Sequence, residues 1–311
     1  MAEAEKGGGG YAYFKRYREI IVDFPAFMET IRTPQPRYIR VNTLRTDTDT
    51  LASRLERRGF RVERTPISEG LEVFGGEPGT TLEYAAGLYY GQDLASMAVA
   101  PVLSPEPETR VFDMCAAPGG KTTHIAQIMQ NTGRVVANDS DWRRLKPLVE
   151  HTGRLGIKSV AVTSLDGARH WYIKRADYIL IDPPCSSEGT VRKNPEVLRK
   201  LSAQFTKTMA GTQKRLLLAA IKNARKGVVI VYSTCTFAPE ENEAVISAAL
   251  GTGLVEVEPV ETPLGHSRGL KKWVDENGEE HLFGGEMEKT IRIYPHQNDS
   301  GGMYIARLRR I

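Results

Sequence analysis

Cysteine is scarce in this chain, whose 311 residues include only Cys115, Cys185 and Cys235. Three scattered cysteines are too few for a disulfide framework or a zinc site, so we expect neither disulfides nor a bound metal. Long apolar runs are missing as well, since no stretch approaches the roughly 18 residues of a membrane span. Residues 1–10 lack the apolar segment of a signal peptide. The sequence therefore predicts a soluble protein of the cytoplasm with no membrane contact.

Neither sign of charge dominates the composition, because 42 Lys and Arg residues are balanced by 38 Asp and Glu residues. The resulting net charge of +4 hardly favours a nucleic acid over no partner. Acidic residues are absent, however, from residues 197–239, which carry eight basic ones. A solvated helix face is the simpler interpretation of that stretch, but the complete lack of carboxylates favours a polyanion as its partner.

The N-terminal part predicts a small α+β module. An aromatic-rich helical region covers residues 11–31 and is interrupted at Asp23-Phe24-Pro25, because proline lacks the N–H that a helix interior needs. After it we expect a strand, an amphipathic helix and two more strands, at residues 37–44, 47–58, 60–64 and 71–74. We place the domain boundary at about residue 90, so that the module comprises residues 1–90.

Three arginines lie along the first strand of this module, namely Arg37, Arg40 and Arg45, and they could present a basic sheet face to RNA. Residues 1–100 nevertheless hold 13 basic and 14 acidic side chains. The module is therefore not a basic domain, and any contact with RNA must come locally from its strand faces.

Residues 91–311 predict a second domain in which strands and helices alternate. Five strands are expected, with helices between them, at residues 110–114, 134–138, 159–163, 177–181 and 228–232. This alternation is typical of right-handed β-α-β units, which build a mainly parallel sheet. The fold class is therefore α/β, and two further strands are expected near residues 290–294 and 303–308.

One strand, turn and helix organise this second domain. The apolar run that ends at Met114 predicts a buried strand, residues 122–129 predict a helix, and Ala116 to Gly120 form the turn between them. Small residues let the backbone of such a turn approach a ligand, and the N-terminus of the following helix points at that ligand. The turn therefore predicts a cofactor site.

Two classes of ligand compete for this turn. Gly120-Lys121-Thr122 matches the end of the phosphate-binding motif G-x-x-x-x-G-K-[ST], but Cys115 stands where that motif requires its first glycine. The alternative ligand is S-adenosylmethionine, whose methyltransferases commonly close the first strand with an acidic residue followed by small residues at alternate positions. The residues with that spacing are Asp113, Cys115, Ala117 and Gly119.

Ligands bind outside the carboxyl ends of the strands in an open parallel sheet, and here those ends carry reactive side chains. Cys185 follows the strand at 177–181, and Cys235 follows the strand at 228–232. A free cysteine is usually a small buried residue, and Cys115 fits that interpretation. Neighbouring parallel strands lie about 5 Å apart, so Cys185 and Cys235 could both reach one planar substrate.

Carboxylates also follow these strands. Asp139 lies about 20 residues beyond the glycine turn, where an acidic side chain accepts hydrogen bonds from a ribose. Asp166 follows the third strand and could contact an adenine edge, and Asp182 follows the fourth. A single acid at a strand end is often a helix cap, but three in register favour a ligand site.

Five ordered motifs resemble those of the Nop/Sun family of RNA cytosine-5 methyltransferases, over about residues 11–311. They are D-x-C-A-A-P-G-G-K-T from Asp113, A-N-D from Ala137 with Arg144, L-D-G from Leu165, D-P-P-C-S from Asp182 with G-T-x-R-K-N-P from Gly189, and Y-S-T-C-T from Tyr232 with P-E-E-N-E after it. Within the family, the pattern around Asn138 and Arg192-Lys193-Asn194 is most similar to the transfer-RNA branch.

This resemblance implies a Rossmann-type S-adenosylmethionine methyltransferase domain, residues 91–311, after a small RRM-like module. The implied cofactor-binding residues are Cys115, Ala116, Ala117, Pro118, Gly119, Gly120, Lys121, Asp139, Arg144, Asp166 and Asp182. The implied partner is RNA, with tRNA as the substrate and rRNA as the alternative. We expect the enzyme to act as a monomer and without a metal.

The resemblance also implies a covalent mechanism. Carbon 5 of cytosine is a poor nucleophile, so a thiolate first adds to carbon 6 and turns the ring into an enamine that attacks the methyl group. Cys235 is the implied nucleophile, and Cys185 assists release of the product. Asp182 is expected to bind the amidine edge of cytosine, and Lys121 to balance charge near the ring carbonyl. In DNA cytosine methyltransferases the nucleophile instead follows the strand that here ends in Cys185.

Overall fold

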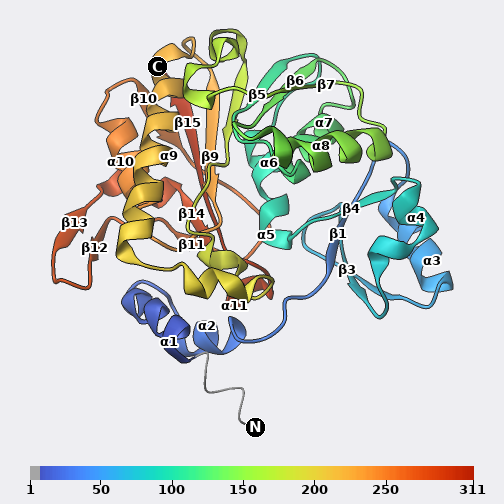
Figure 1. The fold of residues 1–311 in the computed structure, drawn as a ribbon, viewed down its shortest axis with the longest axis horizontal. Coiled ribbons are helices and arrows are strands. Elements are labelled where there is room, and N and C mark those ends of the chain that lie inside the picture. The colour runs from blue at the N-terminus through green and yellow to red at the C-terminus, as the bar shows by residue number, and fades with distance from the viewer. Residues whose placement is uncertain (1–7) are drawn as a thin grey trace.

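A helical segment opens the computed structural model, which describes residues 8–311 (Figure 1). Its elements are α1 (Gly8–Tyr11), η2 (Ala12–Tyr17) and α2 (Phe24–Thr30). The side chain of Asp23 caps α2 by accepting a hydrogen bond of 3.2 Å from the N–H of Ala26, and Pro25 lies in the first turn, where its missing N–H is not needed. The predicted interruption at this point is confirmed.

The aromatic side chains of this segment form packing contacts with the C-terminal half of the chain. Phe14, Tyr17 and Phe27 are fully buried, and each has its ring centroid within 6.4 Å of the Phe237 ring. Tyr294 belongs to the same cluster. The segment therefore lies against the larger domain, beneath α11 in Figure 1.

The predicted α+β module follows. Its elements are β1 (Tyr38–Val41), α3 (Thr48–Arg57), β2 (Arg61–Arg64), β3 (Gly70–Phe74), η3 (Pro78–Thr80), α4 (Leu82–Ala85) and β4 (Tyr89–Gly91). The four strands form an antiparallel sheet in the order β2-β3-β1-β4. One face buries Ile39, Val41, Leu71 and Val73 against Leu51 and Leu55 of α3. Alternation along each strand thus supplies the apolar face that the module needs to pack its helix.

The prediction of a basic RNA-facing surface along β1 is wrong for Arg40. Its side chain is 1% exposed and donates hydrogen bonds to Gln92, to the Gly120 carbonyl at 2.8 Å and to Thr123 Oγ1 at 2.9 Å. Arg37 pairs with Glu77 instead. Strand alternation turned Arg40 toward the larger domain, so it joins the module to the helix that follows the cofactor turn.

The larger domain is built on a nine-stranded sheet in the order β11-β14-β15-β9-β8-β5-β6-β7, with β10 paired to β15. Its strands are β5 (Arg110–Asp113), β6 (Arg134–Asn138), β7 (Val160–Thr163), β8 (Tyr178–Ile181), β9 (Val229–Thr234), β10 (Val255–Glu258), β11 (Ser267–Arg268), β14 (Ile291–Ile293) and β15 (Met303–Arg310). A separate hairpin comprises β12 (Lys272–Val274) and β13 (Glu280–Leu282).

The sheet is mixed, which corrects the prediction of a mainly parallel one. The five predicted strands are present and parallel, from β7 through β5 to β9. The remaining strands join antiparallel, with β15 paired along the whole of β9. The strand order reverses between β5 and β8, and this is the point at which ligands bind in such sheets.

Helices cover both faces of the sheet (Figure 1). They are α5 (Leu94–Met97), α6 (Val99–Leu103), α7 (Gly120–Ile128), α8 (Trp142–Leu155), α9 (Ala203–Asn223), α10 (Glu243–Leu250) and α11 (Pro295–Asn298). Two short 3-10 turns, η4 (Gly167–Arg169) and η5 (Trp171–Arg175), join β7 to β8 where a helix was predicted. Later 3-10 turns are η6 (Glu188–Thr190), η7 (Pro195–Arg199) and η8 (Gly285–Lys289). Among the described residues, no helix is both long and apolar enough for a bilayer.

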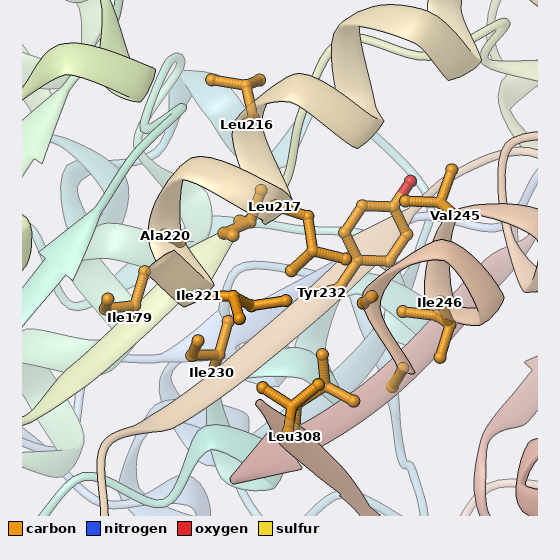
Figure 2. Packing of buried hydrophobic residues seen from close by; sticks show 14 of the residues in the cluster. Ile179, Leu216, Leu217, Ala220, Ile221, Ile230, Tyr232, Val245, Ile246 and Leu308 are labelled. Atoms are coloured by element: carbon orange, nitrogen blue, oxygen red, sulfur yellow. The ribbon is translucent and has the colours of Figure 1, made fainter. Parts of the chain in front are cut away.

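Two apolar cores hold these layers together. On one face, α9 and α10 bury Leu217, Ile221 and Ile246 around Tyr232 of β9 (Figure 2). On the other face, α5, α6 and α7 pack against β5, β8 and β9. The sheet is therefore fixed from both sides, so the loops at its carboxyl edge start from rigid strand ends.

Candidate active site

The turn between β5 and α7 brings small residues and backbone to the carboxyl edge of the sheet. Gly119 has a φ of 107°, which glycine adopts without strain. A Cβ on this residue would lie 3.0 Å from Leu148 Cγ, so a larger residue would press on α8. Thr122 Oγ1 donates a 2.7 Å hydrogen bond to Asp113 Oδ2 and so fastens α7 to the end of β5. The predicted turn is confirmed from Ala116 to Gly119, whereas Gly120 already belongs to α7, which begins two residues before the predicted helix.

Asp139 lies at the end of β6, 2% exposed, in a hollow of about 60 Å³ beside this turn. Its Oδ1 accepts hydrogen bonds from the Asp141 N–H at 3.0 Å and from Arg144 Nη1 at 3.3 Å. Its Oδ2 is buried without a hydrogen bond among residues 8–311, although Arg144 Nη1 lies 3.0 Å away. A buried carboxylate oxygen normally has a donor, so this one is suited to a ligand hydroxyl.

Asp166 is exposed and lies at the rim of the same hollow. Its carboxylate accepts hydrogen bonds of 2.9 and 3.0 Å from Arg215 Nη1 of α9. This guanidinium holds the pKa of Asp166 below its usual value, so the carboxylate stays ionised. Cys115 and Arg144 complete the hollow. Asp139 and Asp166 therefore share one site, whereas Asp182 lies elsewhere.

A larger cavity of about 300 Å³ opens along the same turn. The predicted site residues that line it are Cys115, Ala116, Ala117, Pro118, Gly120, Lys121, Asp182 and Cys235. Asp182, at the end of β8, accepts a hydrogen bond of 2.7 Å from Lys121 Nζ and one of 3.1 Å from Ser233 Oγ. This carboxylate thus presents a fixed edge to the cavity.

The two cysteines predicted to share a cleft do meet, with their Sγ atoms 3.3 Å apart. Cys185 follows β8 and Cys235 follows β9, which is the neighbouring parallel strand. The residues that line the 300 Å³ cavity include Cys235 but not Cys185. The two thiols are therefore not equivalent, because only Cys235 faces the space that a substrate would enter.

The pKa values of the two thiols also differ, and the difference again favours Cys235 as the reactive group. The hydrogen bond from Cys185 lowers the pKa of Cys235 against the opposing effect of burial, and the nearby Lys121 ammonium lowers it further. The same hydrogen bond, together with burial, raises the pKa of Cys185 well above its usual value. Burial alone would lower the pKa of Lys121, but Asp182 outweighs it and the net pKa is raised. The cavity therefore favours a thiolate on Cys235.

Two buried carboxyl groups, which the sequence analysis did not single out, hold the cysteine loops in place. Glu241 accepts hydrogen bonds from the Ser186 N–H at 3.0 Å and from Gln213 Nε2 at 2.7 Å. Glu188 accepts one from Tyr17 Oη at 2.9 Å and one from the Phe237 N–H at 3.1 Å. Glu241 belongs to the P-E-E-N-E motif, and Glu188 lies between D-P-P-C-S and G-T-x-R-K-N-P. Their hydrogen-bond partners are far away in sequence, so only the folded structure reveals them.

The acid-free stretch at 197–239 acquires carboxylates from the rest of the fold. Arg215 pairs with Asp166, and Arg225 pairs with Asp177. Lys207 and Lys222 are exposed on α9. The stretch is therefore less electropositive than its sequence indicates, and its contact with RNA stays a prediction.

Glu188 gives the fold a measurable dependence on pH. Burial, and then the neighbouring Glu241, raise its pKa to about 8. Between the unfolded pKa of about 4.3 and this value the folded chain retains a proton that the unfolded chain releases, so stability falls as the pH rises. We expect a loss on the order of 3–5 kcal/mol between about pH 5 and pH 8 in urea unfolding.

The variant Glu188→Gln, which resembles the protonated carboxyl, should remove the part of the slope that Glu188 contributes. A slope of the same sign and comparable size should remain, because burial raises the pKa of Asp113 to about 7. Glu196→Gln changes an exposed glutamate and serves as the control with the wild-type slope. Equal slopes for Glu188→Gln and the wild type would contradict the assignment.

A family model described as 16S rRNA methyltransferase RsmB/F matches residues 100–309. That segment contains the cofactor turn, both cysteines of the pair and all the carboxylates described above. The chain belongs to this family. RsmB/F membership therefore rests on about two thirds of the chain.

Among the relatives of this RsmB/F chain, the tRNA (cytosine(49)-C(5))-methyltransferase of Pyrococcus abyssi is 37% identical over 293 residues, which cover 93% of this chain and 92% of the relative. The human 28S rRNA (cytosine(4447)-C(5))-methyltransferase is 35% identical over 91% of this chain, which spans only 35% of that relative. The crystal structure of NSun6 from Pyrococcus horikoshii with SFG, an S-adenosylmethionine analogue, matches with a TM-score of 0.82 at 25% identity over 97% of both chains.

These comparisons confirm the predicted Nop/Sun family, the methyltransferase reaction at carbon 5 of an RNA cytosine, and S-adenosylmethionine as the cofactor. The competing interpretation of Gly120-Lys121-Thr122 as a phosphate-binding loop is not supported, since Cys115 breaks that motif. By their names, one of these RsmB/F relatives acts on tRNA and the other on rRNA. Membership of the family therefore does not decide which of the two RNAs is the substrate.

Proposed function

We propose that this chain methylates carbon 5 of a cytosine in tRNA through a covalent adduct with Cys235. One observation carries the mechanism: Cys235 lines the cavity beside Lys121 and Asp182 while Cys185 supports it from 3.3 Å. The tRNA substrate is supported by the Pyrococcus abyssi relative, which the chain matches along 92% of its length.

The residues around the turn fit S-adenosylmethionine. A ribose hydroxyl would satisfy Asp139 Oδ2, the buried oxygen that has no hydrogen bond among residues 8–311. Small residues from Cys115 to Gly120 leave room for the backbone to approach the ligand, and Asp166 with Arg144 borders the adenosine end. When bound, the cofactor supplies an electrophilic methyl group on a sulfonium.

Cys235 would carry the attack on the base. Its thiolate adds to carbon 6 of cytosine, the electron pair moves to carbon 5, and carbon 5 then takes the methyl group. Transfer of the carbon 5 proton to a base then restores the double bond between carbons 5 and 6 and expels the thiolate. The hydrogen bond from Cys185 and the charge of Lys121 support this role, because both favour the ionised form of Cys235.

Asp182 and Cys185 would assist these steps. Asp182 is held by Lys121 and Ser233 with its carboxylate at the cavity wall, where it would bind the amidine edge of cytosine and favour its protonation. Cys185, whose pKa is raised, would remain a thiol and take part in release of the product. The target base must leave its stack to reach these groups.

We also infer that the small module is RRM-like, and the domain division at residues 1–90 and 91–311 is part of this inference. The order β2-β3-β1-β4, with helices in the sequence β-α-β-β-α-β, supports it. Tyr38 and Arg40 on one sheet face are buried against the larger domain. RNA would therefore meet the module at the groove beside that face, not across the whole sheet.

The choice of substrate is tested by methylation in vitro. Unmodified tRNA and rRNA from the host would be incubated with the purified chain and S-adenosylmethionine, and 5-methylcytosine mapped by bisulfite sequencing. We expect modification at a tRNA cytosine that a Cys235→Ala variant does not produce. Methylation of rRNA alone would reject tRNA as the substrate while leaving the reaction in place.

Asp139→Ala should weaken binding of S-adenosylmethionine about tenfold to hundredfold, as expected for loss of a hydrogen bond to a charged group. Isothermal calorimetry checks this, and ATP with Mg²⁺ should give no heat in either protein. Asp141→Ala is the matched control, since that residue caps α8 two positions away and should alter stability but not affinity. Unchanged affinity in Asp139→Ala would remove Asp139 from the cofactor site.

A further inference from the structure

A second cavity, of about 510 Å³, adjoins the active-site cavity. Six residues line both, namely Gln35, Tyr90, Gly91, Gln92, Asp93 and Lys193. The rest of its wall comes from the segment before β1, from β1 itself, the turn before α4, α4, β4 and α8, and from Arg192. Because the two cavities share these six residues, one extended ligand could occupy both.

The second cavity offers aromatic and apolar surface. Its ring-bearing residues are Tyr38, Tyr84, Tyr89, Tyr90 and His151. Tyr84 and His151 are half-buried and present ring surface to the cavity, whereas the other three tyrosines are at most 8% exposed. The Tyr90 and His151 rings lie edge to face, with centroids 4.9 Å apart. Pro34, Pro36 and Pro78 add rigid apolar walls. Unstacked RNA bases bind to surfaces of this kind, because every base has a face that stacks on an aromatic ring.

The charges around the cavity leave one cation available. Arg37 pairs with Glu77, and Arg192 is 8% exposed and engaged by Asp299 and by the Ser300 carbonyl. Lys193 is exposed, and its ammonium forms no ion pair or hydrogen bond within residues 8–311. Its backbone N–H donates to the Thr190 carbonyl at 2.9 Å, which fixes the residue at the junction of the two cavities.

We propose that the second cavity binds the nucleotide next to the target cytosine, with its base against the half-buried rings of Tyr84 and His151 and the connecting phosphate at Lys193. This proposal rests on the proposed RNA methyltransferase function. A cytosine that enters the first cavity pulls its neighbours out of the stack, and the adjoining cavity receives one of them. The enzyme would thereby read the identity or the size of a flanking base.

Removing the flanking base tests the proposal. Single-turnover methylation would be measured on a short RNA that contains the target, and on copies that lack the base at the preceding or the following position. One of the two copies should lose about tenfold in the single-turnover rate constant at subsaturating enzyme, the size of one stacking contact. Equal rates on all three RNAs would overturn the proposal.

A protein variant that fills part of the second cavity complements the test on the RNA. Of the two cavities, Gly79 lines only the second, and a Cβ built on it meets no atom within 4 Å, so the side chain of Gly79→Leu starts from open space at the cavity wall. This variant should methylate the intact RNA about tenfold more slowly, and removing the flanking base should cost it nothing further. Gly285→Leu, also in open space at the start of η8, should behave as the wild type. A full additional loss in Gly79→Leu would place the base elsewhere.

The phosphate contact is tested through salt. Lys193→Met should reduce the slope of log affinity against log salt by about 0.7, the value for one contact with single-stranded RNA. Lys174→Met, at an exposed lysine of η5, should leave the slope unchanged. An unchanged slope in Lys193→Met would reject the contact. If the wild type methylates no RNA but binds S-adenosylmethionine, the proposed function itself fails, whereas normal methylation with no flanking-base effect overturns only the subsite.

Discussion

Cys235→Ala is expected to abolish methylation, with a loss on the order of 10⁴-fold or more in kcat, and to leave no covalent protein–RNA adduct. Cys235 lines the cavity, and in the proposed mechanism its thiolate activates carbon 5 of cytosine. Binding of S-adenosylmethionine should stay within a few-fold of the wild type. Denaturing electrophoresis of protein incubated with labelled RNA and cofactor checks the absence of the adduct.

Cys185→Ala should give the opposite pattern. Addition and methyl transfer proceed, but release is slowed, so a protein–RNA adduct accumulates and survives denaturation. The double variant should show no adduct, because the bond to carbon 6 requires Cys235. An adduct trapped by Cys235→Ala and absent in Cys185→Ala would mean that the strand ending in Cys185 carries the attack, as in the DNA enzymes.

Asp182→Asn is expected to lower kcat/KM about 10²- to 10⁴-fold, the range for loss of a positioned acid or base. The amide keeps the shape of the side chain but removes the charge that binds Lys121 at 2.7 Å and would stabilise protonated cytosine. Single-turnover rates on tRNA measure the effect. Calorimetry with S-adenosylmethionine separates a role toward cytosine, with affinity retained, from a role toward the cofactor.

Ser233→Ala is the matched control for this change. It removes the 3.1 Å hydrogen bond to Asp182 Oδ1 but leaves the carboxylate and its contact with Lys121, so the loss should stay below about tenfold. If Asp182→Asn retains wild-type turnover and only weakens cofactor binding, Asp182 belongs to the cofactor site alone.

The sequence by itself determined the parts of this protein that follow from local pattern. The apolar runs placed the five parallel strands, and the small residues from Ala116 to Gly120 placed the cofactor turn. Because parallel strands end at one edge of a sheet, the residues just after those runs had to gather there. Cys185 and Cys235, fifty residues apart, were for that reason predictable as neighbours.

Only the tertiary structure decided which side chain of each pair faces the cavity and which charges meet. It buried Arg40 against α7, supplied Asp166 and Asp177 to arginines of an acid-free stretch, and put Cys235 but not Cys185 on the cavity wall. It also joined Tyr17 to Glu188 across 171 residues of sequence. Such contacts leave no periodic pattern in the chain, because they depend on how separately formed elements pack and not on spacing within any one of them.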